Sequence, residues 1–287
     1  MVQGGQHLLI IDPQNDFCDL PEEECPQMGG ILHRPALPVP GAHADMLRLA
    51  GLLERAGKGI DAISLTLDSH HHFDISHPAF WQDAAGAAVP SFTTIRATDV
   101  RSGHFAPRLA GSLPRVLAYL DALEANGRYT HMVWPQHCEI GSWGHNIHAA
   151  LRAACNHWEA THLTTVSTLI KGSNPWTEHY SAVMAEVPDP ADPDSGLNRK
   201  LIESLLAADR VLIAGEAGSH CVKATVEHIV AEFPSGARGR LLLIVDCMSP
   251  VSGFEREQAA FLAAMQAQGV QMMHAAELTT QLLAGLR

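Results

Sequence analysis

Three residue types spread along the chain have the chemistry of a cysteine nucleophile and its helpers. Asp12 ends an apolar run, Lys171 stands before a glycine, and Cys221 begins a helical pattern. The thiolate is the nucleophilic form of cysteine, a carboxylate can take the thiol proton, and a nearby ammonium favours the thiolate. Free backbone N–H groups at a helix start also lower a thiol pKa and can hold an oxyanion. Each residue has a simpler interpretation too, as a turn aspartate, a solvated lysine and a buried structural cysteine.

A second group of residues has the types expected of a metal site. One stretch of chain gathers a carboxylate and several imidazoles, and a further histidine follows a later apolar run: Asp68, His70, His71, His72, His77 and His137. In an extended segment Asp68 and His70 point to the same face, and carboxylate with imidazole suits Zn²⁺, Fe²⁺ or Mn²⁺. One Asp with two or three His leaves positions open for water or substrate, as catalytic metals require. The alternative is a polar loop that binds no metal.

The composition favours small-molecule chemistry. A chain of 287 residues with 46% hydrophobic and 17% charged residues can bury a full core. Its formal charge of -12 disfavours nucleic acid and anionic membranes as partners. The sequence shows neither a signal-peptide pattern nor the roughly 20 apolar residues that span a bilayer, so we expect a cytoplasmic protein. The six cysteines are scattered, which favours reduced thiols.

Short apolar runs alternate with longer helical patterns, as is typical of parallel βαβ units. We expect strands at His7–Asp12, Asp61–Leu67, Tyr129–Trp134, Leu163–Ser167, Val211–Gly215, Leu241–Asp246 and Val270–Met273. We expect helices at Ala42–Ala56, Pro114–Ala125, Ile147–Glu159, Asn198–Ala208, Cys221–Phe233, Phe254–Gln268 and Ala276–Leu286. Ligands bind beyond the carboxyl ends of the strands of such a sheet. Both groups of residues should therefore lie at that edge.

No Gly/Ser linker or internal repeat divides the chain, so we expect residues 1–287 to form a single doubly wound domain. Two segments interrupt the alternation, Cys18–Pro40 and His71–Ser112. Both are rich in Pro, Gly, His and Asp, and both are too long for plain connections. We interpret the region around 71–112 as a long insertion that alters recognition before it alters chemistry.

Taken in order, the motifs resemble those of the isochorismatase-like cysteine hydrolases, and among these the nicotinamidases. The matching segments are Ile11–Phe17, Asp68–His70, Trp134–Cys138, Lys171–Gly172 and Gly215–Val222. They span most of the chain. The resemblance implies a three-layer α/β/α sandwich with a mainly parallel, doubly wound sheet, which is the isochorismatase-like hydrolase fold.

The resemblance also implies roles for single residues. Asp12, Lys171 and Cys221 match the family's catalytic trio. The family's cis peptide would fall between Glu216 and Ala217, which makes the N–H groups of Ala217 and Cys221 the oxyanion hole. The family's metal ligands match one carboxylate and two histidines, with a third histidine as the extra ligand: Asp68, His70, His137 and His77. The residues that sandwich the planar ring of the substrate match two aromatics: Phe17 and Trp134.

The resemblance thus predicts a cysteine-dependent, nicotinamidase-like amidohydrolase that converts a small planar amide to acid and ammonia through a thioester. It implies a divalent metal, Zn or else Fe or Mn, and a homo-oligomer, since related enzymes are often dimers or tetramers. Glu216 and Gly218-Ser219 depart from the nicotinamidase pattern. Hydrolysis of another small amide or ureide, or of an isochorismatase-type vinyl ether, therefore stays open. A non-catalytic binding protein on the same fold is disfavoured by the intact trio.

Overall fold

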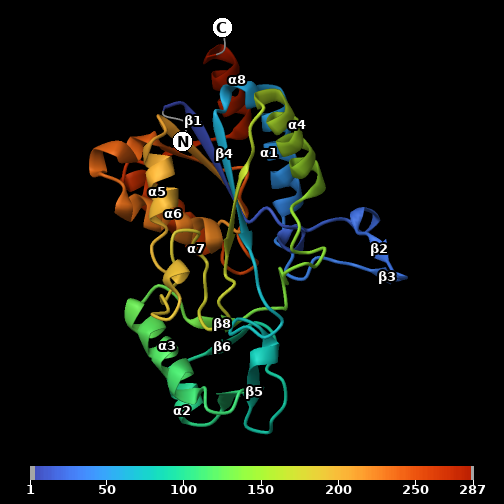
Figure 1. The fold of residues 1–287 in the computed structure, drawn as a ribbon, viewed down its shortest axis with the longest axis vertical. Helices are drawn as coiled ribbons and strands as arrows, with labels where there is room; N and C mark the ends of the chain where they lie inside the picture. Colours follow the sequence, from blue (N-terminus) through green and yellow to red (C-terminus); the bar gives the residue numbers. More distant parts are fainter. Residues whose placement is uncertain (1–3, 286–287) are drawn as a thin grey trace.

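Six parallel strands form the central sheet of the protein, for which the computed structural model describes residues 4–285 (Figure 1). Their order is β12-β11-β10-β1-β4-β9, and every neighbouring pair is parallel. The strands are β1 Gln6–Ile11, β4 Ala62–Asp68, β9 Ser167–Lys171, β10 Arg210–Gly215, β11 Leu241–Ile244 and β12 Gln271–Met273. The order reverses beside β1, and such a reversal is where open α/β sheets bind ligands.

Helices cover both faces of this sheet. The first face packs against α1 Ala42–Ala56, α4 Ala149–His162 and α8 Ala275–Gly285, and the second against α5 Arg199–Leu206, α6 Cys221–Glu232 and α7 Glu255–Ala267. Strand β1 supplies both cores because successive side chains alternate: Leu8 and Ile10 lie in the first, Leu9 and Ile11 in the second. The predicted three-layer α/β/α fold is confirmed.

A smaller lobe extends from the carboxyl edge of the sheet, at the bottom of Figure 1. It contains β5 Trp81–Asp83, β6 Thr93–Ile95, α2 Ala97–Arg101, β7 Phe105–Pro107, α3 Leu113–Asn126 and β8 His131–Val133. Two antiparallel pairs, β5·β7 and β6·β8, and a separate apolar core hold it together. The fully buried Phe80 and Trp81 belong to that core. The stretch predicted as an insertion is therefore largely structured.

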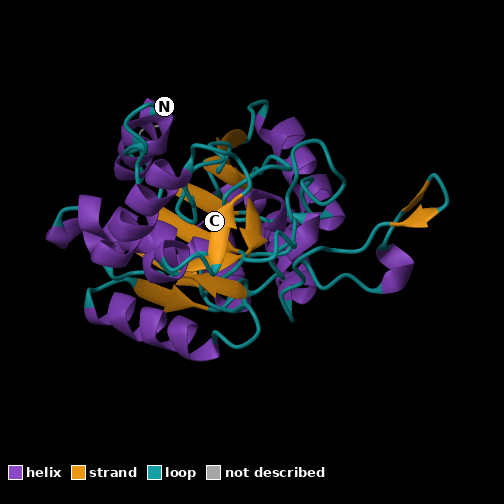
Figure 2. Ribbon diagram, turned by 90° about the horizontal axis from the view of Figure 1, so that it is seen from below, coloured by secondary structure: helices purple, strands orange, loops and turns teal. Residues whose placement is uncertain are grey.

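A short hairpin of β2 Gln27–Met28 and β3 Ile31–Leu32 projects away from the body of the molecule, at the right of Figure 2. We call residues 21–34 the arm. The remaining elements are 3₁₀ turns: η1 Asn15–Phe17, η2 Glu22–Glu24, η3 Gly57–Gly59, η4 Pro78–Phe80, η5 Pro193–Ser195 and η6 Ser235–Arg240. None of the helices described is both long and apolar enough to cross a bilayer.

Two strand predictions are wrong: one strand pairs with a different partner, and the other lies at a different position. The run Tyr129–Trp134 holds a strand, but β8 pairs with β6 in the small lobe instead of joining the central sheet. The strand expected at Leu163–Ser167 lies four residues later, because Leu163 takes a left-handed conformation that ends α4 and is 91% exposed. The last predicted helix, Ala276–Leu286, corresponds to α8, with Leu286 outside the described residues.

Candidate active site

Asp12, Lys171 and Cys221 meet at the carboxyl edge of the central sheet. The Lys171 Nζ lies 2.8 Å from Oδ2 of Asp12 and 3.7 Å from Sγ of Cys221. All three side chains are buried. Asp12 is also fixed by Thr66, whose hydroxyl donates to its Oδ1 at 2.5 Å and accepts from its backbone N–H. The three groups are therefore preorganised at hydrogen-bonding distances.

The parallel register explains this meeting. Ile11 lies opposite Gly215, so the chain leaves β1 and β10 at the same level, and Asp68 lies opposite Lys171. Asp12 follows β1 directly, while Lys171 is the last residue of β9 and Cys221 the first of α6. Lys171 thus lies within a strand, which corrects the prediction from the sequence that it follows a strand end.

Burial dominates the protonation of the site. Burial raises the pKa of the Cys221 thiol well above its ordinary value, although the Lys171 charge opposes this. This direction is opposite to the lowered thiol pKa that the helix start alone predicts. Burial opposes the charge on Lys171, but Asp12 and Asp68 outweigh it and raise the pKa of the ammonium. Burial likewise raises the pKa of Asp12. The resting site pairs a protonated thiol with a charged lysine.

The chain between β10 and α6 leaves two backbone N–H groups without a partner among the described residues. The peptide between Glu216 and Ala217 is cis, and the chain then enters α6 at Cys221. Within residues 4–285, the N–H groups of Ala217 and Cys221 donate no hydrogen bond, whereas those of His220 and Val222 donate to the Ala217 carbonyl. Free N–H groups beside a nucleophile are the donors that an oxyanion hole requires.

The histidine-rich stretch forms a buried cluster next to Asp68. Nitrogen atoms of His70, His77 and His137 all lie within 4.8 Å of one another. Asp68 Oδ2 is 3.0 Å from His70 Nε2 and 3.4 Å from His137 Nε2, while its Oδ1 accepts from Lys171 at 2.9 Å. One carboxylate therefore links the metal-type cluster to the trio. His71 and His72 are exposed and point elsewhere.

The donor set fits a divalent transition metal. Three imidazoles and a carboxylate are typical ligands of Zn²⁺, Fe²⁺ and Mn²⁺. Asp74 Oδ2 lies 3.1 Å from Nδ1 of His70, which is the outer carboxylate that commonly orients a metal-binding imidazole. His77 also joins the cluster, as its place in the sequence suggested. Burial lowers the pKa of His77 to about 2, so its imidazole is neutral and able to bind a cation.

Phe17 and Trp134 line a narrow pocket together with Cys221. The other lining residues include Leu37, Glu178, Tyr180, His220 and Val251. The free space is about 20 Å³, enough for one water molecule. A planar ring can enter only when the walls separate.

Sequence reasoning missed Glu178, Tyr180 and His220. Burial raises the pKa of Glu178 to about 7 and lowers that of His220 to about 3. One oxygen of Glu178 has no hydrogen-bond partner among the described residues. The long polar segment after Lys171 was the available signal, because loops at this edge of the sheet supply ligand-binding side chains.

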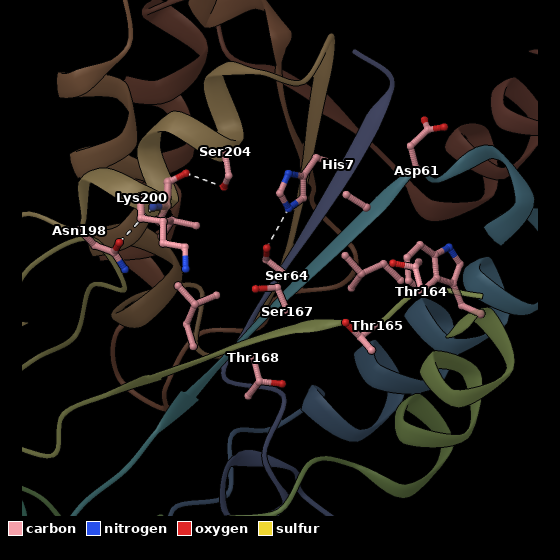
Figure 3. A pocket seen from close by; sticks show the side chains of 15 residues that line it. His7, Asp61, Ser64, Thr164, Thr165, Ser167, Thr168, Asn198, Lys200 and Ser204 are labelled. Carbon is pink, nitrogen blue, oxygen red and sulfur yellow. Dashed lines mark hydrogen bonds between the residues drawn. The ribbon is translucent and has the colours of Figure 1, made fainter. Parts of the chain in front are cut away.

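A larger cavity of about 400 Å³ lies far from this chemistry, at the opposite ends of β1, β4 and β9 (Figure 3). It opens beside α5 and contains none of the trio. His7 and Ser64 form a 2.8 Å hydrogen bond in its wall, drawn as a dashed line. Size alone would favour this cavity, but it contains neither Asp12, Lys171 and Cys221 nor the cluster of His70, His77 and His137.

Solved structures with the same fold cover nearly the whole chain. A nicotinamidase/pyrazinamidase from Acinetobacter baumannii is 20% identical, with a TM-score of 0.61 over 97% of this chain and 100% of that one. A pyrazinamidase of Pyrococcus horikoshii in complex with zinc is 17% identical, with a TM-score of 0.51 over 94% and 99%. An isochorismatase-like hydrolase from Alkaliphilus metalliredigens is 14% identical, with a TM-score of 0.51 over 97% and 99%.

At these identities the likeness establishes the fold. The predicted resemblance to isochorismatase-like hydrolases is confirmed at that level. Comparison with protein-family models and with curated proteins finds no match.

Proposed function

We propose that this protein is a cysteine amidohydrolase, nicotinamidase-like, that converts a small planar amide to its acid and ammonia. One observation carries the proposal: Lys171 Nζ lies between a carboxylate at 2.8 Å and a thiol sulfur at 3.7 Å in a buried site. The solved structures of nicotinamidases and pyrazinamidases on this fold support it. Phe17 and Trp134 in the pocket wall suit an aromatic ring.

The reaction begins when the substrate carbonyl accepts hydrogen bonds from the N–H groups of Ala217 and Cys221. Asp12 takes the thiol proton as the sulfur attacks the carbonyl carbon, and Lys171 stabilises the charge that develops on the sulfur. The C–N bond then breaks while Asp12 returns the proton to the departing nitrogen, which leaves as ammonia. A thioester to Cys221 remains.

Hydrolysis of the thioester uses the same groups in reverse. Asp12 takes a proton from water as its oxygen attacks the thioester carbon, and the sulfur leaves to regain a proton while the acid departs. His70, His77, His137 and Asp68 would hold a divalent cation here. When bound, such a cation supplies Lewis-acid polarisation of a substrate donor or of water.

Glu178 favours a second candidate within the same class. Its unpartnered carboxyl oxygen and His220 line the pocket, so the wall is more polar than a simple aromatic amide needs. Another small amide or a ureide with extra N–H donors would satisfy these groups.

Ammonia release tests the proposal. Nicotinamide, pyrazinamide, and a panel of aliphatic amides and ureides are each incubated with the wild-type protein and with Cys221→Ala. We expect release with at least one substrate and a fall of roughly 10³-fold or more in Cys221→Ala, because the nucleophile is lost. Equal rates for the two proteins would overturn the assignment.

A further inference from the structure

A second set of metal-type side chains lies outside the catalytic pocket. Glu24 belongs to η2 in the arm, His43 is the second residue of α1, and His148 immediately precedes α4. One ligand atom from each lies within 4.8 Å of the other two. Three elements thus bring two imidazoles and a carboxylate together, and His148 lies more than a hundred residues along the chain from the other two.

The spacing resembles that of the catalytic cluster. Nδ1 of His43 is 3.0 Å from Nε2 of His148, and the imidazole nitrogens of His77 and His137 are 3.3 Å apart. Two nitrogens bound at about 2.0–2.1 Å to one tetrahedral Zn²⁺ are separated by roughly 3.3 Å. A small increase in the distance between His43 Nδ1 and His148 Nε2 would therefore let both nitrogens bind one zinc ion. Glu24 Oε1 approaches the same ring, 3.6 Å from His43 Nε2.

Two of these elements are held firmly in place, and a neighbouring cavity has room for water. His148 is 2% exposed, so its imidazole cannot swing away. Asp19 holds the backbone N–H groups of Gly41 and His43 at 2.8 Å each, which fixes the start of α1. A cavity of about 210 Å³ adjoins the cluster and is lined by Glu24 and His148 together with Asn15, Asn146 and Arg152, among other residues. Water molecules in this cavity could complete a coordination shell.

The local charge is mainly negative. Glu22 and Glu23 precede Glu24 in the same turn, and Glu22 pairs with Arg34 at 2.9 Å, whereas Glu23 has no ion-pair partner among the described residues. Arg152 is a positive charge in the cavity wall, but the chain as a whole carries a formal charge of -12. A divalent cation is thus attracted to this side of the protein.

We propose that Glu24, His43 and His148 form a second divalent-metal site, for Zn²⁺ or a cation of similar preference, that fastens the arm to the body. Two histidines and one glutamate are a ligand set that zinc accepts, with water at the remaining position. The bound ion joins η2 to α1 and to the start of α4. It restrains an arm that otherwise projects into solvent (Figure 2).

Metal stoichiometry tests the proposal without reference to catalysis. Chelator-treated full-length protein is dialysed against Zn²⁺ and analysed for bound metal, and the affinity of each site is measured by calorimetry. We expect two ions per wild-type chain and one ion in His43→Asn. His137→Asn, which disrupts the catalytic cluster, should also bind one, and the double variant none.

Two further variants, Glu24→Gln and His157→Asn, test whether a loss of bound metal results from misfolding. Glu24 has an exposed side chain, so its substitution leaves the fold intact, and we expect its second site to bind Zn²⁺ about tenfold or more weakly. His157 is an exposed histidine of α4 outside both clusters, and its variant should retain two ions. Hydrogen exchange of the arm should slow with Zn²⁺ in the wild type and in His137→Asn but not in His43→Asn. A single ion in the wild type that His43→Asn retains, or unchanged binding in both His43→Asn and Glu24→Gln, overturns the proposal.

Discussion

Lys171 is the residue on which the electrostatics of the site depend. Its ammonium contacts the carboxylates of Asp12 and Asp68, the carbonyl of His179 and the sulfur of Cys221. Two buried carboxylates so close together would repel each other without a cation between them. Lys171 therefore stabilises the fold, and in the proposed function the same charge prepares Cys221 for attack.

Replacing Lys171 by Met should reduce both stability and activity. Removing one partner of a buried ion pair leaves unpaired charges, which costs about 3–5 kcal/mol. The free energy of unfolding from urea titration and the rate of ammonia release measure the two effects. Lys58→Met, at an exposed lysine, should change stability by less than about 0.5 kcal/mol. A stable and active Lys171→Met protein would contradict this view of the site.

Glu216 gives a pH dependence of stability that is separate from the catalytic groups. It is fully buried, one of its oxygens has no partner among the described residues, and burial together with the Asp45 charge raises its pKa well above the ordinary 4.5. The unfolded chain loses this proton first as pH rises past that value, so the folded state becomes less stable with increasing pH.

Glu216→Gln should remove this penalty. We expect similar stability of variant and wild type near about pH 4 and greater stability of the variant near about pH 8, because Gln carries no ionisable proton. The Gln oxygen can still accept from the N–H of Ser249, as Oε2 of Glu216 does. Urea unfolding across this range measures the difference, and Glu54→Gln, on the exposed side of α1, serves as the control. Parallel stability curves would refute the idea.

At the scale of elements, the spacing of apolar residues predicted the positions of several helices and strands. The helix predicted at Ala42–Ala56 has the bounds of α1, and the apolar runs of β1, β10 and β11 gave strands close to those observed. Partners were harder, since the run containing β8 is equally suited to a small antiparallel sheet. The run after Leu163 has strand-forming residues, yet tertiary contacts place β9 further on.

Some residues of the site could be predicted from local motifs, whereas others depend on long-range packing. Strand-end motifs predicted the residues that meet around Lys171, because parallel strands bring their carboxyl ends to one edge. Glu178 and His220 could not be assigned to the pocket from the sequence. Their places depend on how the loops after β9 and β10 pack against the lobe, which no short pattern encodes.

The end of β10 requires glycine. Gly215 has φ of 128°, and a Cβ built there would lie 2.0 Å from the carbonyl oxygen of Ile11. Gly215→Ala should therefore destabilise the protein by at least about 1–3 kcal/mol and lower activity, since β1 and β10 carry Asp12 and Cys221 at their ends.

Gly218→Ala is the matched comparison. The added methyl there meets the end of the Gln258 side chain, which can move, so we expect a smaller loss. Thermal unfolding and ammonia release should rank the two variants in this order. Equal effects would show that the β1–β10 contact does not control the site.

At the scale of the whole molecule, the pocket lies between two parts of the chain. Trp134 and His137 follow the last strand of the lobe, while Ala217, Cys221 and Val251 follow strands of the central sheet. The free space of about 20 Å³ requires these parts to separate before a substrate enters. We therefore expect the lobe to move when the proposed substrate binds.

Metal at the catalytic cluster should restrain this movement. His70 follows β4, whereas His77 and His137 flank the lobe, so a shared cation would join the two parts. Adding Zn²⁺ to chelator-treated protein should slow hydrogen exchange in residues 78–133 and stabilise the fold by about 2.7 kcal/mol at a hundredfold excess over Kd. The slower exchange of residues 78–133, together with this site's share of the stabilisation, should vanish in His137→Asn and persist in His43→Asn. Unchanged exchange in the wild type would exclude this cross-link.

Asp68 has one oxygen turned to Lys171 and the other to the imidazoles. The nucleophile and the cation site therefore share a counter-ion, and neither can be altered in evolution without changing the other. A descendant that lost its metal would have to replace the missing positive charge or give up the carboxylate, and giving it up would shift the balance around Cys221. If the proposed function holds, substrate range and metal preference should consequently diverge together among relatives of this protein.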